Sequence, residues 1–211
     1  MRQVKICGLT EAASFDVVVE AGADYAGMVF YPNSPRYLRH DQAASLAQRP
    51  RGRTQLVGLF VNPEIEMVAT TLQHVALDIL QIYGSASLVA TLQARFGLPV
   101  WRQLGAASTA DFPPPDEQTD GFVVEAKPPP GATRPGGNGV LADWALLKGF
   151  PSTRPWLLAG GLNPENVAMA LRQVEAPGAD VSSGVETAPG QKNPDLIRRF
   201  VQAVRSVEPD T

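Results

Sequence analysis

The chain has 211 residues and a net charge of −3, from 18 lysines and arginines against 21 aspartates and glutamates, and it contains no basic tract. This balance argues against nucleic acid or an anionic membrane as a partner. The single cysteine excludes an internal disulfide, and no apolar run approaches the roughly 20 residues that a membrane-spanning helix needs. With 44% hydrophobic residues and no recognisable signal peptide, we expect a cytoplasmic protein with a sizeable core.

Short apolar runs alternate with amphipathic stretches along the whole chain. The apolar runs predict eight strands, over Val4–Cys7, Tyr25–Phe30, Leu56–Val61, Ile79–Ile82, Val100–Leu104, Gly121–Glu125, Trp156–Ala159 and Ala179–Ser182. The amphipathic stretches predict helices over Glu11–Ala21, Asp41–Gln48, Pro63–Gln73, Ser87–Phe96, Trp144–Lys148, Pro164–Gln173 and Pro194–Val204. Asn163 and Asn193 each precede a proline, a pattern typical of a helix start. The crossover from Ala107 to Asp120 contains three consecutive prolines, so any helix in it is short.

Strands that alternate with helices pair in parallel through right-handed crossovers. Eight such units within 211 residues predict a compact (β/α)8 TIM barrel, forming a single domain over residues 1–211. The alternative is a doubly wound open sheet, which normally has fewer strands, and no Gly-x-Gly-x-x-Gly turn follows the first strand here. The segment Pro128–Gly139 is rich in proline and glycine, and we interpret it as an active-face loop rather than a linker.

In such a barrel the functional side chains lie at the carboxyl ends of the strands. Several expected strands have apolar bodies but end in polar or reactive residues, which are Cys7, Gln81, Tyr83, Glu125, Asp180 and Ser182. This pattern indicates that the strand ends share one functional mouth. In the first strand Val4 and Ile6 share one face, whereas Lys5 and Cys7 share the other, which we expect to approach the site.

Cys7 and Glu125 are candidates for acid–base chemistry. A lone cysteine is commonly a small buried hydrophobe, but it is also a candidate base, because a neighbouring cation such as Lys5 lowers a thiol pKa. A carboxyl at the inner end of an apolar strand is a candidate general acid, because burial raises its pKa. The alternative for Glu125 is an ion pair with Lys127 or Arg102. A thiol facing a carboxyl suits proton transfer on a sugar, and therefore isomerisation.

The loops after the last two expected strands predict a phosphate site. Barrels often bind phosphate there, through backbone N–H groups that glycine allows to approach closely. Gly160 and Gly161 follow the seventh strand, and Ser182, Ser183 and Gly184 follow the eighth. A plain tight turn is the alternative for each loop taken alone. Together they point to a small phosphosugar as the substrate, and so to an isomerase or lyase.

Arg36 follows Pro32-Asn33-Ser34-Pro35, whose two prolines stiffen the loop after the second strand. A guanidinium held there suits bidentate recognition of a carboxylate, and a solvated surface arginine is the alternative. His40 and His74 end no strand, so we interpret both as surface or helix residues. No cluster has metal-ligand spacing, and we expect neither a metal nor another cofactor.

Six segments stand out in order along nearly the whole chain. They are Lys5–Thr10 (KICGLT), Phe30–Tyr37 (FYPNSPRY), Val57–Asn62 (VGLFVN), Leu80–Gly84 (LQIYG), Ala159–Val167 (AGGLNPENV) and Asp180–Glu186 (DVSSGVE). In these segments the chain resembles the phosphoribosylanthranilate isomerases, barrel enzymes of tryptophan biosynthesis. The resemblance implies an Amadori rearrangement of an N-phosphoribosyl aromatic amine.

The resemblance also implies roles for individual residues. Cys7 corresponds to the general base, and Glu125 corresponds to an aspartate that is the family's general acid. Tyr83 stands where the family more often has histidine. The implied substrate contacts are Arg36 with the anthranilate carboxylate, Gln81 and Asp180 with the substrate, and Gly160, Gly161, Ser182, Ser183 and Gly184 with the phosphate.

Two other functions are compatible with these patterns. A histidine-pathway aminoaldose isomerase is one, although such barrels usually have aspartate where Cys7 stands and a second phosphate loop. A barrel that binds ligands without catalysis is the other. We expect a monomer or a homodimer with no nucleic-acid and no membrane partner.

Overall fold

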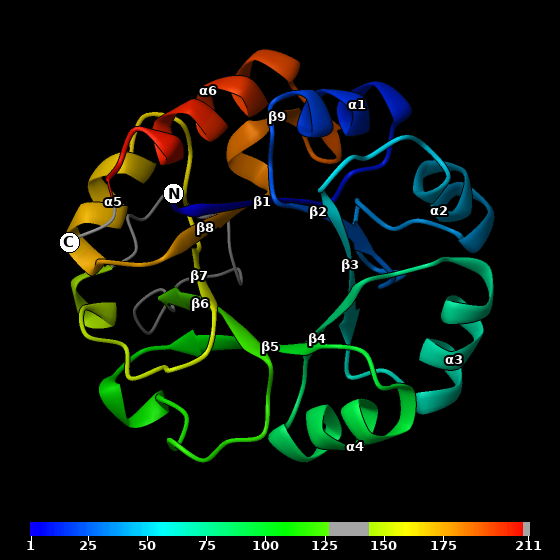
Figure 1. Ribbon diagram of the computed structural model, residues 1–211, viewed down its shortest axis with the longest axis horizontal. Helices are drawn as coiled ribbons and strands as arrows, with labels where there is room; N and C mark the ends of the chain where they lie inside the picture. The colour runs from blue at the N-terminus through cyan, green and yellow to red at the C-terminus, as the bar shows by residue number, and fades with distance from the viewer. Residues whose placement is uncertain (127–143, 209–211) are drawn as a thin grey trace.

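Eight parallel strands form a closed barrel in the computed structural model, which describes residues 1–126 and 144–208. The strands are β1 (Gln3–Cys7), β2 (Tyr25–Val29), β3 (Gln55–Val61), β4 (Ile79–Tyr83), β5 (Val100–Ala106), β6 (Gly121–Ala126), β7 (Trp156–Ala159) and β8 (Gly178–Val181). Each pairs with the next in sequence, and β1 pairs with β8 to close the ring (Figure 1). The expected (β/α)8 barrel is therefore confirmed.

Helices surround the ring of strands (Figure 1). The α-helices are α1 (Ala12–Glu20), α2 (His40–Ala47), α3 (Ile65–His74), α4 (Ala86–Phe96), α5 (Val167–Val174) and α6 (Pro194–Arg205). Short 3₁₀ turns are η1 (Thr109–Asp111), η2 (Trp144–Leu147) and η3 (Ser183–Val185). The crossover after β5 thus carries only a short turn in the described residues, as its prolines predict. No helix in the described part of the chain is long and apolar enough to cross a membrane.

Three local expectations need correction. The segment from Trp144 forms a 3₁₀ turn instead of an α-helix. Helix α5 begins at Val167, because the Asn163 side chain accepts hydrogen bonds from the backbone N–H groups of Glu165 and Asn166 and so holds a turn before the helix. A hairpin of β9 (Glu186–Ala188) and β10 (Gln191–Lys192) follows η3 and was not expected. Pro128–Gly139, the expected loop, lies outside the described residues.

Strand side chains alternate between two environments. Outward residues such as Val4 and Ile6 join the large core beneath the helices. Inward residues fill the barrel with a smaller cluster, made of Tyr25, Val57, Ile79, Trp101, Val123, Leu157 and Ala159. The rings of Tyr25 and Trp101 meet edge-on at 4.9 Å, which is a favourable aromatic geometry. The barrel interior is therefore packed below the mouth, and the polar strand ends lie above that packing.

Candidate active site

Lys5 and Asp180 form an ion pair inside the barrel at neighbouring positions of β1 and β8. Their register places Lys5 beside Asp180, with Nζ 2.8 Å from Oδ1. The Lys5 side chain has no solvent exposure. Although burial lowers the lysine pKa, Asp180 and Cys7 outweigh it and raise the pKa of Lys5 above its ordinary value. The lysine is therefore a fixed cation beneath Cys7.

Cys7 is a buried thiol at the end of β1, on the inward face that the sequence pattern predicts. Burial raises the pKa of Cys7, Asp180 adds to the rise, and the cations of Lys5 and Lys192 lower it. The expected effect of Lys5 on the thiol is present, but burial outweighs it. Cys7 therefore rests as a neutral thiol at neutral pH.

Glu125 is the last residue but one of β6, and its side chain points toward the barrel interior, as that of Val123 does. Burial, and then the charge of Asp180, raise the pKa of Glu125 above the ordinary carboxyl value. The alternative of an ion pair between Glu125 and Arg102 is wrong, because Arg102 Nη1 lies 2.6 Å from the carboxylate of Glu117 instead. Lys127, the other possible partner, lies outside the described residues. The raised pKa favours a proton on the Glu125 carboxyl.

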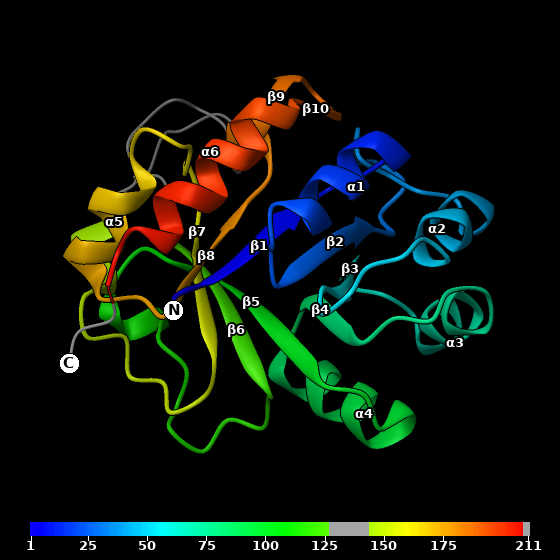
Figure 2. The same cartoon turned by 45° about the horizontal axis from the view of Figure 1, so that its top comes forward.

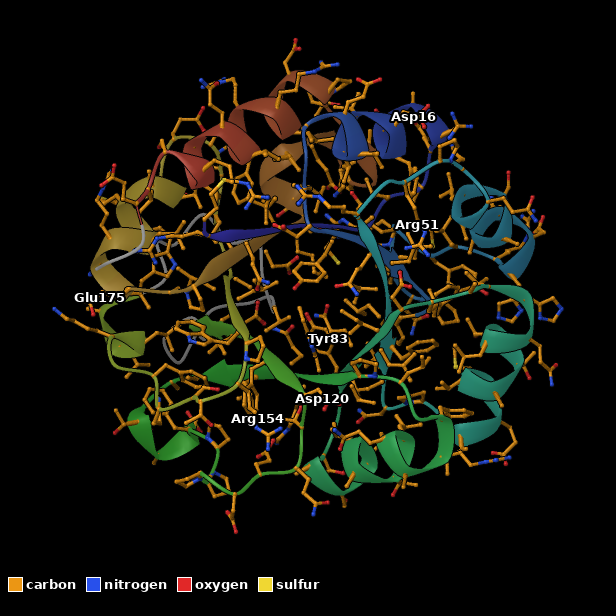
Figure 3. The ribbon with its side chains drawn as sticks, in the orientation of Figure 1. Asp16, Arg51, Tyr83, Asp120, Arg154 and Glu175 are labelled. Atoms are coloured by element: carbon orange, nitrogen blue, oxygen red, sulfur yellow. The ribbon has the colours of Figure 1, made fainter. Side chains whose placement is uncertain are left out.

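Tyr83 lies inside the ring of strands, as Figure 3 shows. Burial raises its pKa well above the ordinary value, and the charges of Glu125, Cys7 and Asp180 add to the rise. These four groups are thus close enough to influence one another. No role for Tyr83 follows from the sequence, although its inward position at the end of β4 was the available signal.

Gln81 lies one inward position below Tyr83 and is almost completely buried. Its Nε2 donates a hydrogen bond to Oε1 of Gln103 at 2.8 Å, whereas its own Oε1 has no hydrogen-bond partner among the described residues. The amide therefore lies under the mouth with one buried acceptor that no described residue pairs.

The loops after β7 and β8 pack backbone against backbone. Gly160 and Gly161 both adopt positive φ, which other residues adopt at a cost. A Cβ at Gly184 would lie 1.8 Å from the carbonyl oxygen of Leu162. Next to it Ser182 donates from Oγ to the carbonyl of Cys7 at 3.1 Å, and Ser183 begins η3. The structure thus brings the residues of the expected phosphate site together.

Arg36 lies at the mouth, held by a carboxylate of the chain itself. Its Nε and Nη2 donate to the two oxygens of Glu186 at 2.7 and 2.6 Å, and its side chain is only 20% exposed. The alternative of a solvated surface arginine is therefore wrong. Its stem passes over Gly8, where a Cβ would lie 2.3 Å from Cδ of Arg36. Lys192 completes this group, with Nζ 2.6 Å from Glu186.

Glu186 and Lys192 were not expected at the site, because both belong to the unexpected β9–β10 hairpin. The only signal was that Glu186 closes the last of the matched segments. His40 and His74 belong to α2 and α3, as expected, and their rings stack at 5.1 Å.

Comparison with known proteins identifies the family. The sequence model of the family described as N-(5'-phosphoribosyl)anthranilate (PRA) isomerase matches residues 4–203. The chain belongs to this family. The N-(5'-phosphoribosyl)anthranilate isomerase of Acidiphilium cryptum is 47% identical over 206 residues, covering 98% of this chain and all of that protein. The isomerase of Paracoccus denitrificans is 50% identical over 204 residues, covering 94% of each chain.

Solved structures of the family share the barrel. Phosphoribosyl anthranilate isomerase from Thermotoga maritima superposes with a TM-score of 0.83 at 32% identity, covering 97% of this chain and 99% of that one. A phosphoribosyl anthranilate isomerase in complex with reduced 1-(o-carboxyphenylamino)-1-deoxyribulose 5-phosphate gives a TM-score of 0.79 at 30% identity, with the same coverage. The chain is therefore an isomerase of tryptophan biosynthesis, and the resemblance seen in its sequence is confirmed.

Proposed function

We propose that this isomerase converts N-(5-phosphoribosyl)anthranilate into 1-(2-carboxyphenylamino)-1-deoxyribulose 5-phosphate, with Cys7 as general base and Glu125 as general acid. The observation that carries the proposal is the pair of inward side chains at the carboxyl ends of β1 and β6, a thiol and a carboxyl whose pKa values are both raised by burial and by the charge of Asp180. Family membership supports the overall reaction.

The reaction needs one proton delivered and one removed. Glu125 protonates the furanose ring oxygen, the bond from that oxygen to C1 breaks, and the ring opens to an iminium ion. The Cys7 thiolate then removes the C2 proton, which gives an enolamine that tautomerises to the ketose. Atoms and electrons balance within the substrate, so the reaction is an internal redox isomerisation. Cys7 is buried and Glu125 is partly buried, which limits the access of water to the proton transfers.

The remaining residues of the mouth bind the substrate in this proposal. Arg36 holds the anthranilate carboxylate, and Asp180 accepts from the amine and the sugar hydroxyls. Gln81 contributes the acceptor oxygen that no described residue uses. The phosphate lies against the backbone of the two packed loops, at Gly160, Gly161, Ser182, Ser183 and Gly184.

We further propose that the barrel is a single domain, acts in the cytoplasm, and forms a monomer or a homodimer. The Thermotoga maritima relative was crystallised as monomers generated from a dimeric enzyme, so both states are compatible with the fold. Light scattering of the purified chain at several concentrations distinguishes them.

The test of the proposed function is turnover of N-(5-phosphoribosyl)anthranilate. We expect Cys7→Ala and Glu125→Ala each to lower kcat by about 100-fold or more, because each removes one proton-transfer group. Circular dichroism checks that both variants keep the fold, and Met169→Ala, which changes an exposed side chain, is the control. Wild-type turnover in folded Cys7→Ala overturns its assignment as base. Failure of the wild-type chain to complement a tryptophan auxotroph that lacks the isomerase favours a non-catalytic barrel.

Glu125→Asp tests the departure from the family's aspartate. Glutamate moves the proton donor by about one bond length, and a displacement of about 1 Å can cost about 100-fold in rate. A higher kcat for Glu125→Asp shows that glutamate is a compromise, whereas a lower kcat shows that the surrounding barrel is matched to the longer side chain.

A further inference from the structure

The guanidinium of Arg36 has a second binding edge. Arginine carries five N–H donors in a rigid plane, and Glu186 takes the edge formed by Nε and Nη2. The other edge consists of Nη1 and the outer N–H of Nη2, and no described residue accepts a hydrogen bond from Nη1. A second carboxylate can therefore bind end-on while Glu186 stays bound side-on.

The Glu186 carboxylate is itself fixed in place, because it contacts Lys192 as well as Arg36. Its carboxylate lies 2.6 Å from Nζ of Lys192, and both side chains are almost completely excluded from solvent, at 4% and 0% exposure. Burial alone would raise the pKa of Glu186, but hydrogen bonds from Arg36 and Lys192 outweigh it and the pKa is lowered. The carboxylate therefore remains charged and keeps one orientation.

Lys192 connects this carboxylate to the rest of the mouth. Its Nζ donates to the carbonyl oxygen of Ser182 at 3.0 Å and lies 3.3 Å from Ser182 Oγ, which in turn donates to the carbonyl of Cys7. A continuous set of polar contacts thus runs from Arg36 to the end of β1. It joins the expected carboxylate site to the expected phosphate loop and the expected base.

The β9–β10 hairpin that supplies Glu186 and Lys192 is itself fixed. A Cβ at Gly190, in the hairpin turn, would lie 2.7 Å from the carbonyl oxygen of Pro35, the residue before Arg36. The Thr10 hydroxyl donates to the Gly190 carbonyl at 3.1 Å. Figure 2 shows the hairpin at the end of the barrel toward which β1 points.

We propose that Glu186 and Lys192 are positioning residues, which hold the Arg36 guanidinium so that its free edge receives the carboxylate of the substrate's aromatic ring. The inference rests on the proposed function, which assigns that carboxylate to Arg36. An arginine already fixed in its bound orientation loses less side-chain freedom when the substrate arrives, so the substrate binds more tightly. Neither residue touches the reacting atoms, and the contribution is to KM more than to kcat.

The test compares Glu186→Gln with wild type on two substrates, N-(5-phosphoribosyl)anthranilate and N-(5-phosphoribosyl)aniline, which lacks only the carboxylate. We expect the KM of Glu186→Gln for the anthranilate to rise about 10- to 100-fold, the range for losing charge-assisted hydrogen bonds. The KM for the aniline and both kcat values should change by less than about threefold, because Arg36 contacts only the carboxylate. Glu186→Asp keeps the charge and should restore part of the lost affinity.

The chain offers a matched control in the pair Arg102–Glu117. Glu117 is 4% exposed like Glu186, and Arg102 is 22% exposed, against 20% for Arg36. Glu117→Gln therefore removes an equally buried carboxylate whose partner, Arg102, lies on the outward face of β5, and we expect its KM for both substrates to match wild type. Thermal unfolding of both variants measures how much stability each has lost.

Two outcomes overturn the positioning role. They are an equal rise in KM for both substrates in Glu186→Gln, and wild-type KM values in that variant. If wild type turns over neither substrate, the proposed function fails and calorimetry decides the inference separately. The probes are then reduced 1-(o-carboxyphenylamino)-1-deoxyribulose 5-phosphate and the same compound without its carboxylate. Selective loss of affinity for the first in Glu186→Gln supports the role, and equal affinity of wild type for both probes overturns it.

Discussion

Cys7 and Glu125 occupy surroundings that favour the uncharged form of each. Burial raises both pKa values, and the carboxyl, whose ordinary pKa is the lower, loses its proton at a lower pH than the thiol. The proposed mechanism uses the thiolate together with the carboxylic acid, which is the minor pair of protonation states. The fraction of enzyme in that state does not change with pH between the two pKa values. At pH values below the pKa of Glu125 this fraction decreases, because the thiolate is lost without any gain in protonated carboxyl. The fraction also decreases at pH values above the pKa of Cys7.

The raised pKa values of Cys7 and Glu125 set the pH profile of kcat/KM. For wild type we expect a broad plateau, with the acid limb above the ordinary carboxyl range and the alkaline limb above the ordinary thiol range. In Glu125→Gln the acid no longer titrates, so the residual kcat/KM should rise about tenfold per pH unit through neutral pH, following the thiolate alone. Initial rates from pH 5 to 10 measure both profiles. A flat profile in Glu125→Gln contradicts the assignment of Glu125 to the acid limb.

The loops after β7 and β8 act as one element, because Gly184 lets their backbones touch. A Cβ there would lie 1.8 Å from the carbonyl oxygen of Leu162, which neither backbone can avoid without moving. The two loops would separate, and the proposed phosphate site would separate with them.

We therefore expect Gly184→Ala to raise the KM for substrate and to weaken competitive inhibition by inorganic phosphate, both by at least about tenfold, with a stability loss of about 1–3 kcal/mol. Gly97→Ala is the control. Gly97 ends α4 at φ +64° with no atom within 4 Å of an added Cβ, so alanine costs about 1–2 kcal/mol of local strain and leaves the loops in place. Wild-type phosphate inhibition in Gly184→Ala would show that the contact between the loops does not shape the site.

The last helix packs the end of the chain against its beginning. Helix α6 lies beside α1 and α5 in Figure 2 and packs on both and on β1. Its Arg205 lies 2.8 Å from Asp24, just before β2. Phe200 is its largest fully buried side chain. The end of the chain therefore stabilises the first two βα units.

Phe200→Ala should lower the free energy of unfolding by about 3–5 kcal/mol, through lost burial and the cavity that remains. For a chain of this size that corresponds to a Tm about 10 °C lower. Met169→Ala on the exposed face of α5, 55% exposed in wild type, should change stability by less than about 0.5 kcal/mol. Calorimetry of the two variants measures the contrast, and equal Tm values would mean that the packing of α6 does not stabilise the barrel.

The local elements that the sequence failed to predict have weak apolar patterns. Strands β9 and β10 have three and two residues, and neither shows the alternation that marks a strand. The start of α5 depends on which backbone groups the Asn163 side chain binds, since both a cap and a turn before the helix are compatible with Asn-Pro. Each of these features depends on single hydrogen bonds instead of a repeated pattern.

The sequence by itself determined the barrel, the order of its strands, the inward position of Cys7 and Glu125, and the place of Asp180 near a strand end. These follow from apolar periodicity and strand alternation, which are local properties of the chain. Only the tertiary structure decided which charges meet. Lys5 and Asp180 are 175 residues apart in sequence, and Arg36 and Glu186 are 150 apart. Electrostatic energy depends on distance through space and on burial, so the state of the Cys7 thiol and the orientation of Arg36 became visible only in the closed barrel.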